Sequence, residues 1–155
     1  DTNDDLASLE YFKRAAELDP ANVKAVTGGA AALVRLRQFV RAKTVLDAGL
    51  ERIPDSGEIA FALARLLAAC PDVEVRAGER ALELAQVVYA ARPDPRHAQL
   101  VAQALAELDR CEEAAEWQQK VVDAAVEDGA AGVLTALRAD LDLYRGGSPC
   151  RIPAE

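Results

Sequence analysis

The stretch Ala15-Ala16-Glu17-Leu18-Asp19-Pro20 decides the fold, because a related stretch follows it at a fixed distance. Gly49-Leu50-Glu51-Arg52-Ile53-Pro54 ends in a proline 34 residues after the first one, and Val88-Tyr89-Ala90-Ala91-Arg92-Pro93 ends in a third proline 39 residues later. Each stretch closes a segment with apolar residues at helical spacing. A period of this length, with one insertion of five residues, indicates helix pairs that stack on one another.

The apolar pattern along the whole chain predicts eight helices. Small residues recur where two antiparallel helices must approach closely, as at Gly28-Gly29, Ala42, Ala81 and Ala114. Because a single pair cannot bury its own apolar face, we expect the pairs to stack into a solenoid. The expected helices cover residues 5–18, 22–36, 38–52, 57–69, 77–91, 95–108, 112–127 and 130–145.

The repeating unit resembles that of tetratricopeptide-repeat (TPR) proteins. In that family an aromatic residue opens the second helix, alanine follows three residues later and proline closes the repeat, as do Phe39, Ala42 and Pro54 here. The third repeat departs from the pattern, because Cys111 replaces the aromatic residue and the closing proline is missing. The resemblance implies an all-α, TPR-like right-handed α-solenoid of antiparallel helix pairs. It divides residues 1–145 into a half repeat at 1–20, repeats at 23–56, 57–94 and 95–128, and a capping helix at 130–145, with a tail at 146–155.

Composition and motifs exclude several functions. The 26 acidic residues outnumber the 18 basic ones among 155, and the net charge of −8 argues against nucleic-acid binding. No apolar run approaches the length of about 18 residues that a membrane span needs. No nucleophile, phosphate-binding or metal motif is present. We therefore predict no enzyme activity and no cofactor, and we expect the single histidine, His97, to be an exposed surface residue rather than a metal ligand.

The resemblance implies that the first helix of each pair lines a concave groove that binds a protein or peptide. This face has a basic bias and one aromatic residue, so we predict a partner with acidic residues. The alternative is that these charges are solvated and pair locally, for example Arg65 with Glu58. The predicted groove residues are Lys24, Thr27, Arg35, Phe61, Arg65, Arg96, Gln99 and Gln103.

The predicted function is a non-catalytic protein-interaction or scaffold module. The alternative is self-association, or an accessory structural role within a larger protein. The first helix lacks a pair of its own, so it is the predicted contact for a homo-oligomer. The resemblance of the Cys70-Pro71-Asp72 segment and of the Leu143–Pro149 ending to bacterial TPR proteins implies the C-terminal part of a longer bacterial chain.

Two features leave alternatives open. The five extra residues within 69–78 form either a protruding contact loop or, as we expect, a lengthened turn with Val73 and Val75 buried. Cys111 and Cys150 come within reach of each other if the last two helices are antiparallel. We expect three reduced cysteines, and the alternative is a Cys111–Cys150 bridge. The compartment is undecided between a favoured cytoplasmic location and a periplasmic or secreted one, which the bridge would indicate.

Overall fold

The computed structural model describes residues 2–147 and 150, and every element within them is a helix. The predicted all-α fold is therefore confirmed, and each of the eight expected helices is present with its ends shifted by three residues or fewer. No described helix is long and apolar enough to cross a membrane. The helices are α1 (Thr2–Leu18), α2 (Val23–Arg35), α3 (Phe39–Arg52), α4 (Gly57–Ala69), α5 (Gly78–Ala91), α6 (Pro95–Glu107), α7 (Cys111–Glu127) and α8 (Ala131–Arg145).

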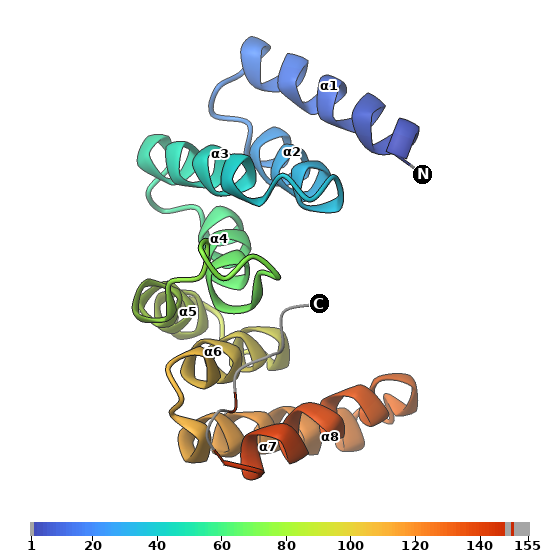
Figure 1. The fold of residues 1–155 in the computed structure, drawn as a ribbon, viewed down its shortest axis with the longest axis vertical. Helices are drawn as coiled ribbons and strands as arrows, with labels where there is room; N and C mark the ends of the chain where they lie inside the picture. Colours follow the sequence, from blue (N-terminus) through green and yellow to red (C-terminus); the bar gives the residue numbers. More distant parts are fainter. Residues whose placement is uncertain (1, 148–149, 151–155) are drawn as a thin grey trace.

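The helices form a TPR-like solenoid. Each helix packs on its neighbours in the chain, and α4 also contacts the first helices of the repeats before and after it, α2 and α6. Figure 1 shows the stack as an arc, with α1 at one end and α7 and α8 at the other, both projecting toward the same side. This arrangement places the first helices α2, α4 and α6 along the inner side of the arc.

The first helices begin at side chains that cap them. Asn22, Ser56 and Asp94 each precede a first helix and accept a hydrogen bond from the backbone N–H three residues later, over 2.9, 3.3 and 3.0 Å. These bonds satisfy amide groups that have no partner inside the helix, and each is worth about 1 kcal/mol. Pro95 follows Asp94 at the first helical position, where its missing N–H costs nothing. The sequence thus fixes where each inner helix starts.

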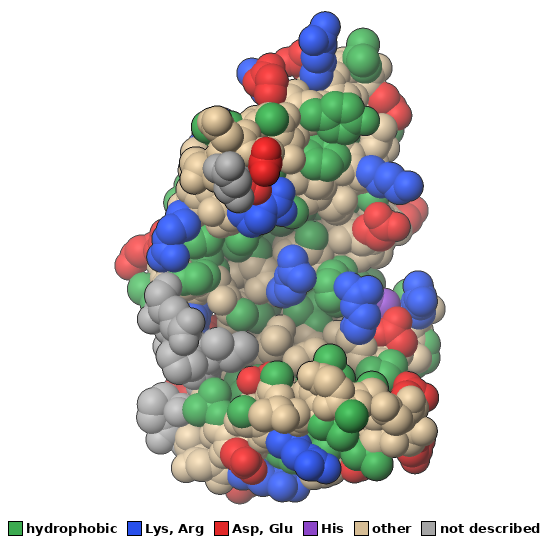
Figure 2. All heavy atoms as spheres, turned by 90° about the vertical axis from the view of Figure 1, so that its right-hand side faces the viewer, with side chains coloured by type: hydrophobic (Ala, Val, Ile, Leu, Met, Phe, Trp, Pro, Cys, Tyr) green, Lys and Arg blue, Asp and Glu red, His purple; other side chains and the backbone are tan. Residues whose placement is uncertain are grey.

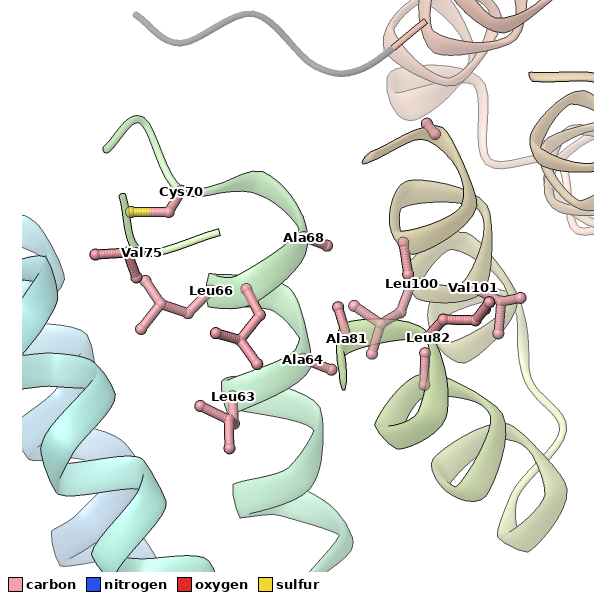
Figure 3. Packing of buried hydrophobic residues seen from close by; sticks show 14 of the residues in the cluster. Leu63, Ala64, Leu66, Ala68, Cys70, Val75, Ala81, Leu82, Leu100 and Val101 are labelled. Carbon is pink, nitrogen blue, oxygen red and sulfur yellow. The ribbon is translucent and has the colours of Figure 1, made fainter. Parts of the chain in front are cut away.

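The core consists of aliphatic side chains that alternate with alanines. Leu63 and Ala64 of α4 are fully buried, as are Ala81 of α5 and Ala102 of α6. Figure 3 shows α4 side chains pointing on one side toward α5 and α6 and on the other toward the preceding pair. Alanine at these crossings lets the helix axes approach, so the small-residue period explains the close stacking.

Gly28 provides the closest approach of α1 to the rest of the solenoid. A Cβ atom at this position would lie 2.4 Å from the ring of Phe12 on α1. The glycine therefore makes room for the aromatic ring of the half repeat. This agrees with the expectation that small residues at Gly28-Gly29 let two helices approach closely.

The insertion between α4 and α5 is packed on the neighbouring repeat rather than extended into solvent. Val75 is buried as expected, but the expectation for Val73 is wrong, since its side chain is 58% exposed. Asp72 caps the turn by accepting from the N–H of Glu74 over 3.1 Å, which leaves Val73 at the outer corner. Arg76 then reaches α6 and forms an ion pair with Glu107 over 2.9 Å, with side chains only 3% and 10% exposed.

At the C-terminal end, Cys111 and Cys150 are joined by a disulfide bond with Cα atoms 5.7 Å apart. The expectation of three reduced cysteines is therefore wrong for this structure, in which Cys70 alone is free. Helix α8 runs back along α7, so its C-terminal end lies near the start of α7, where Cys150 is bonded to Cys111. The backbone N–H of the buried Cys150 also donates a hydrogen bond to the carboxylate of Asp109, over 3.3 Å.

One face of α8 packs its apolar side chains against α7. Leu137, Leu141 and Tyr144 are buried and Leu134 is half-buried against α7. Val133 is the exception, because it is exposed at the start of the helix. The opposite face carries Arg138 and other polar residues, as a terminal helix requires.

Candidate functional site

The inner side of the arc holds two adjoining cavities. The first, here called the apolar cavity, has a volume of about 320 Å³ and lies between α2 and α4. The second, here called the basic cavity, has a volume of about 600 Å³ and lies between α4 and the start of α6. Thr27 and Arg65 line both, so the two cavities form one groove along the first helices. Figure 2 faces this side and shows basic side chains beside hydrophobic ones in its middle.

Phe61 is the centre of the basic cavity. The guanidinium carbon of Arg96 lies 5.4 Å from its ring centroid and that of Arg65 lies 6.0 Å away. His97 packs its ring 5.4 Å from the same centroid, tilted by 60°. Cations over an aromatic face gain about 0.5–1 kcal/mol each at exposed sites. The ring therefore holds two cations in fixed places on the inner face.

The two arginines on Phe61 are not neutralised by neighbours. Neither Arg65 nor Arg96 forms an ion pair within the described residues, and the local pair of Arg65 with Glu58 is not formed, although Glu58 also lines the basic cavity. Arg92, at the rim of the same cavity, does have a partner in Asp94, over 3.3 Å. The groove thus presents guanidinium groups whose hydrogen-bond donors face solvent.

His97 corrects one expectation. Its side chain is only 16% exposed, so it is not the open surface residue that the sequence suggested. Nδ1 donates to the backbone carbonyl of Arg92 over 2.6 Å and lies 3.5 Å from a carboxylate oxygen of Asp94. The capping turn at Asp94-Pro95 folds the ring onto Phe61. His97 is therefore part of the wall that supports the aromatic ring.

The electrostatics of the same turn favour an ionised Asp94. Burial by itself raises the pKa of this carboxyl, but the N–H of His97 and the charges of His97 and Arg92 outweigh it, so the pKa is lowered overall. Asp94 therefore stays charged and holds both the helix start and the imidazole in place. The support of Phe61 depends on this carboxylate.

The apolar cavity extends the groove toward α2. Its wall is formed by Thr27, Ala31 and Val34 of α2, by Arg65 of α4 and by Gln103 of α6, with Phe39 and Leu66 deeper in. The hydroxyl of Thr27 donates to the carbonyl of Val23 over 2.9 Å, which leaves its methyl group for the wall. The cavity therefore offers an apolar floor with polar groups at one edge.

Three predicted groove residues lie outside both cavities. Lys24 is exposed on α2. Arg35 forms an ion pair with Asp5 of α1, and Gln99 forms a hydrogen bond to Asp140 of α8. Two predicted side chains at the margins of the inner face are thus bound to residues of the end helices α1 and α8. The structure brings together Thr27, Phe61, Arg65, Arg96 and Gln103.

Several groove residues escaped the sequence analysis. Cys70 and Pro71, at the start of the insertion, close one end of the apolar cavity, while Val88 and Ala91 of α5 contribute to the basic one. For Cys70 and Pro71 the sequence offered one indication, because they follow the end of α4, an inner helix. Burial raises the pKa of the Cys70 thiol, so this cysteine stays protonated.

Metal-binding residues do not gather in the groove. Among the residues that the structure describes, the single group of three potential ligands is Asp109, Cys111 and Cys150. Its two sulfur atoms are bonded to each other, so they are not free to coordinate an ion. Within the described part of the chain, His97 belongs to no such group.

Comparison with known proteins assigns the repeat. Residues 6–70, which span α1 to α4, match the family model described as tetratricopeptide repeat. No curated protein and no solved structure matches the chain. Repeats of this family generally mediate protein–protein interaction. The matched residues are thus similar to tetratricopeptide repeats, and the same helical stack continues from α4 to α8.

Proposed function

We propose that the groove binds a segment of a partner protein in which an apolar side chain lies next to acidic residues, and that the role is binding without covalent chemistry. The observation that carries the proposal is the position of Arg65 and Arg96 over Phe61, free of ion pairs within the described residues. A chain with a net charge of −8 places two unneutralised cations side by side on its inner face.

The chemistry of the guanidinium groups supports an acidic partner. Arginine presents a planar fork of donors that matches a carboxylate, and its flat face remains stacked on an aromatic ring while it does so. Because the ring already holds both groups, less side-chain entropy is lost on binding than with two mobile lysines. The expected partner residues are therefore aspartate and glutamate, placed over Phe61.

The apolar cavity supports an aliphatic or aromatic anchor beside these acids. Its volume of about 320 Å³ exceeds the roughly 150 Å³ at which an apolar cavity holds benzene. Val34 and Leu66 supply apolar contact, and Arg65 separates this cavity from the basic one. An anchor in the apolar cavity and an acid on Arg65 thus lie within a few residues of each other along an extended segment.

The proposal is tested with a random peptide library displayed on phage and selected on the folded protein. We expect enriched peptides to combine one large apolar residue with two or more acids. Enriched peptides are then synthesised and their affinities measured by isothermal titration calorimetry. The variant Arg65→Glu with Arg96→Glu should bind them at least roughly 30-fold more weakly, equivalent to about 2 kcal/mol.

A matched control carries the same change in net charge away from the groove. Arg52→Glu with Arg138→Glu alters two exposed arginines on α3 and α8. This variant should keep its affinity within about twofold. Selection of basic peptides, selection of no peptides, or equal loss in both variants would overturn the acidic-segment proposal.

A further inference from the structure

Helix α1 carries a face that no other part of the described chain covers. Among the eight helices it is the one without any buried residue. It is a second-type helix, because it precedes α2 as α3 precedes α4, and no first helix within the described residues pairs with it. Its contact with the solenoid is made on one side, where Leu9 and Phe12 meet α2.

Comparison with the equivalent positions of the other second-type helices shows which residue of α1 is unusually exposed. In α3, α5 and α7, the third residue after the small one is Val45, Leu84 or Trp117, and each of these packs partly buried against the core. The corresponding residue of α1, three after Ser8, is Tyr11, whose side chain is 70% exposed. An aromatic side chain is therefore exposed to solvent at the position where the three repeats partly bury an apolar side chain.

Tyr11 is the centre of a regular stripe. Exposed residues follow one another at spacings of three and four, which places them on one side of the helix. Leu18 at the end of the stripe is 85% exposed. This spacing is that of a seam along which two helices pack side by side. The stripe consists of Asp4, Ala7, Tyr11, Arg14 and Leu18.

The stripe is complementary to itself when two copies lie antiparallel. Asp4 and Arg14 each lie five residues from position 9, and Ala7 and Tyr11 each lie two residues from it. In an antiparallel pair centred there, Asp4 faces Arg14 of the other copy and Ala7 receives its Tyr11, each contact occurring twice. Neither Asp4 nor Arg14 forms an ion pair with another described residue.

The α8 end of the solenoid does not offer a matching surface for α1 of a second copy. If α1 of a second copy packed on α8, α8 would need a small residue at the crossing. In α4 and α6 this residue is the alanine of Leu63-Ala64 and of Val101-Ala102. The corresponding pair in α8 is Leu137-Arg138, and Arg138 is exposed. A charged side chain at the crossing disfavours a head-to-tail stack of two copies, whereas a closed two-fold contact between two α1 helices avoids it.

We propose that the α1 stripe is the contact for a second copy of this chain, which forms an antiparallel α1–α1 pair and so a two-fold dimer. The contact is separate from the groove, so dimerisation leaves both grooves open. One helix per partner buries a small area, so the dimer is weak and concentration-dependent.

Sedimentation equilibrium of the protein over a wide concentration range tests the proposal. The wild type should shift from monomer toward dimer as its concentration rises, and Tyr11→Glu should weaken the dimer at least tenfold. Asp4→Arg and Arg14→Asp should each weaken it, while the double variant Asp4→Arg with Arg14→Asp should restore it, because the swapped charges again face each other. Leu6→Glu, on another exposed part of α1, is the matched control and should leave the dimer unchanged.

The outcomes separate this contact from the groove and from misfolding. Circular dichroism of each variant should match the wild type, and affinity for a groove peptide should be unaffected by Tyr11→Glu. A wild type that remains monomeric at every concentration overturns the proposal. So does a dimer that survives Tyr11→Glu, is lost in Leu6→Glu, or is not restored by the charge swap.

Discussion

The two ends of the solenoid are closed to different degrees. At the C-terminal end, α8 covers α7, the Cys111–Cys150 bond returns the chain to the start of α7, and Arg138 occupies a position that is alanine in two inner helices. At the N-terminal end, α1 buries no residue and leaves Tyr11 in solvent. At the C-terminal end, a charged side chain and a disulfide bond disfavour the stacking of a further helix. At the N-terminal end, the helical repeat has neither feature, and α1 keeps an exposed face that a further helix can contact.

The largest contrast is expected between two ion pairs. Arg76→Met should destabilise the protein by about 3–5 kcal/mol, because it leaves the buried Glu107 without its cation. Arg35→Met should cost less than about 1 kcal/mol, since the pair with Asp5 at the open end is half exposed. Urea unfolding followed by circular dichroism measures both. Equal losses would show that the half-exposed pair at the N-terminal end contributes as much as the buried pair between the insertion and α6.

The disulfide should give the next largest effect. Cys111 and Cys150 are 39 residues apart in sequence, so their bond restricts a long loop of the unfolded chain. Cys150→Ser should therefore cost about 3 kcal/mol in the oxidised protein. Thiol titration of the denatured, unreduced wild type should find one free thiol, that of Cys70. Three thiols would show that the C-terminal end is closed by packing alone.

The attachment of α1 can be loosened at one glycine. Gly28→Val should cost about 2 kcal/mol, because its side chain would occupy the space of the Phe12 ring. Gly132→Val is the matched control in α8, where nothing lies within 4 Å of an added Cβ, and it should change stability by less than about 1 kcal/mol. Hydrogen exchange should show the loss of protection in α1 only. Loss spread over all helices would mean that α1 is part of the cooperative core.

The smallest effect is expected from a carboxyl at the closed end. Burial raises the pKa of Asp140, and the hydrogen bond from Gln99 only partly opposes it. An acid whose pKa is higher in the folded than in the unfolded state destabilises the fold once it is ionised in both. Asp140→Asn should therefore stabilise the protein by less than about 1 kcal/mol at pH 7, and the gain should vanish near pH 3. Urea midpoints at the two pH values measure it, with the exposed Asp142→Asn as a control that should change little at either pH.

The helices could be predicted from the sequence because their signals are local. The local signals are the capping residues at the starts of α2, α4 and α6 and the prolines that follow α1, α3 and α5. They act within one turn, so they mark these boundaries without reference to the rest of the chain. The small-residue period likewise predicts the stacking, because each repeat meets the next in the same way. The fold of a solenoid is thus a sum of short-range choices.

The site could be predicted only in part, because its walls combine distant segments. Phe61, Arg65 and Arg96 follow from their inward register on successive first helices. The pairing of Arg35 with α1 and of Gln99 with α8 depends on how the end helices lie across the inner face, and no local pattern reveals it. His97 was misjudged for a related reason, since the turn at Asp94 folds its ring inward.

The bond between Cys111 and Cys150 also determines how the chain carries tension. A pull applied between the start of the solenoid and residue 150 passes through the sulfur atoms and bypasses residues 112–149. Helices α7 and α8 lie within this bypassed segment, so they stay unloaded while α1 to α6 extend. Reduction would release roughly 130 Å of additional contour at about 3.4 Å per residue. Stretched in a force spectrometer, the oxidised protein should thus be shorter at full extension by this length.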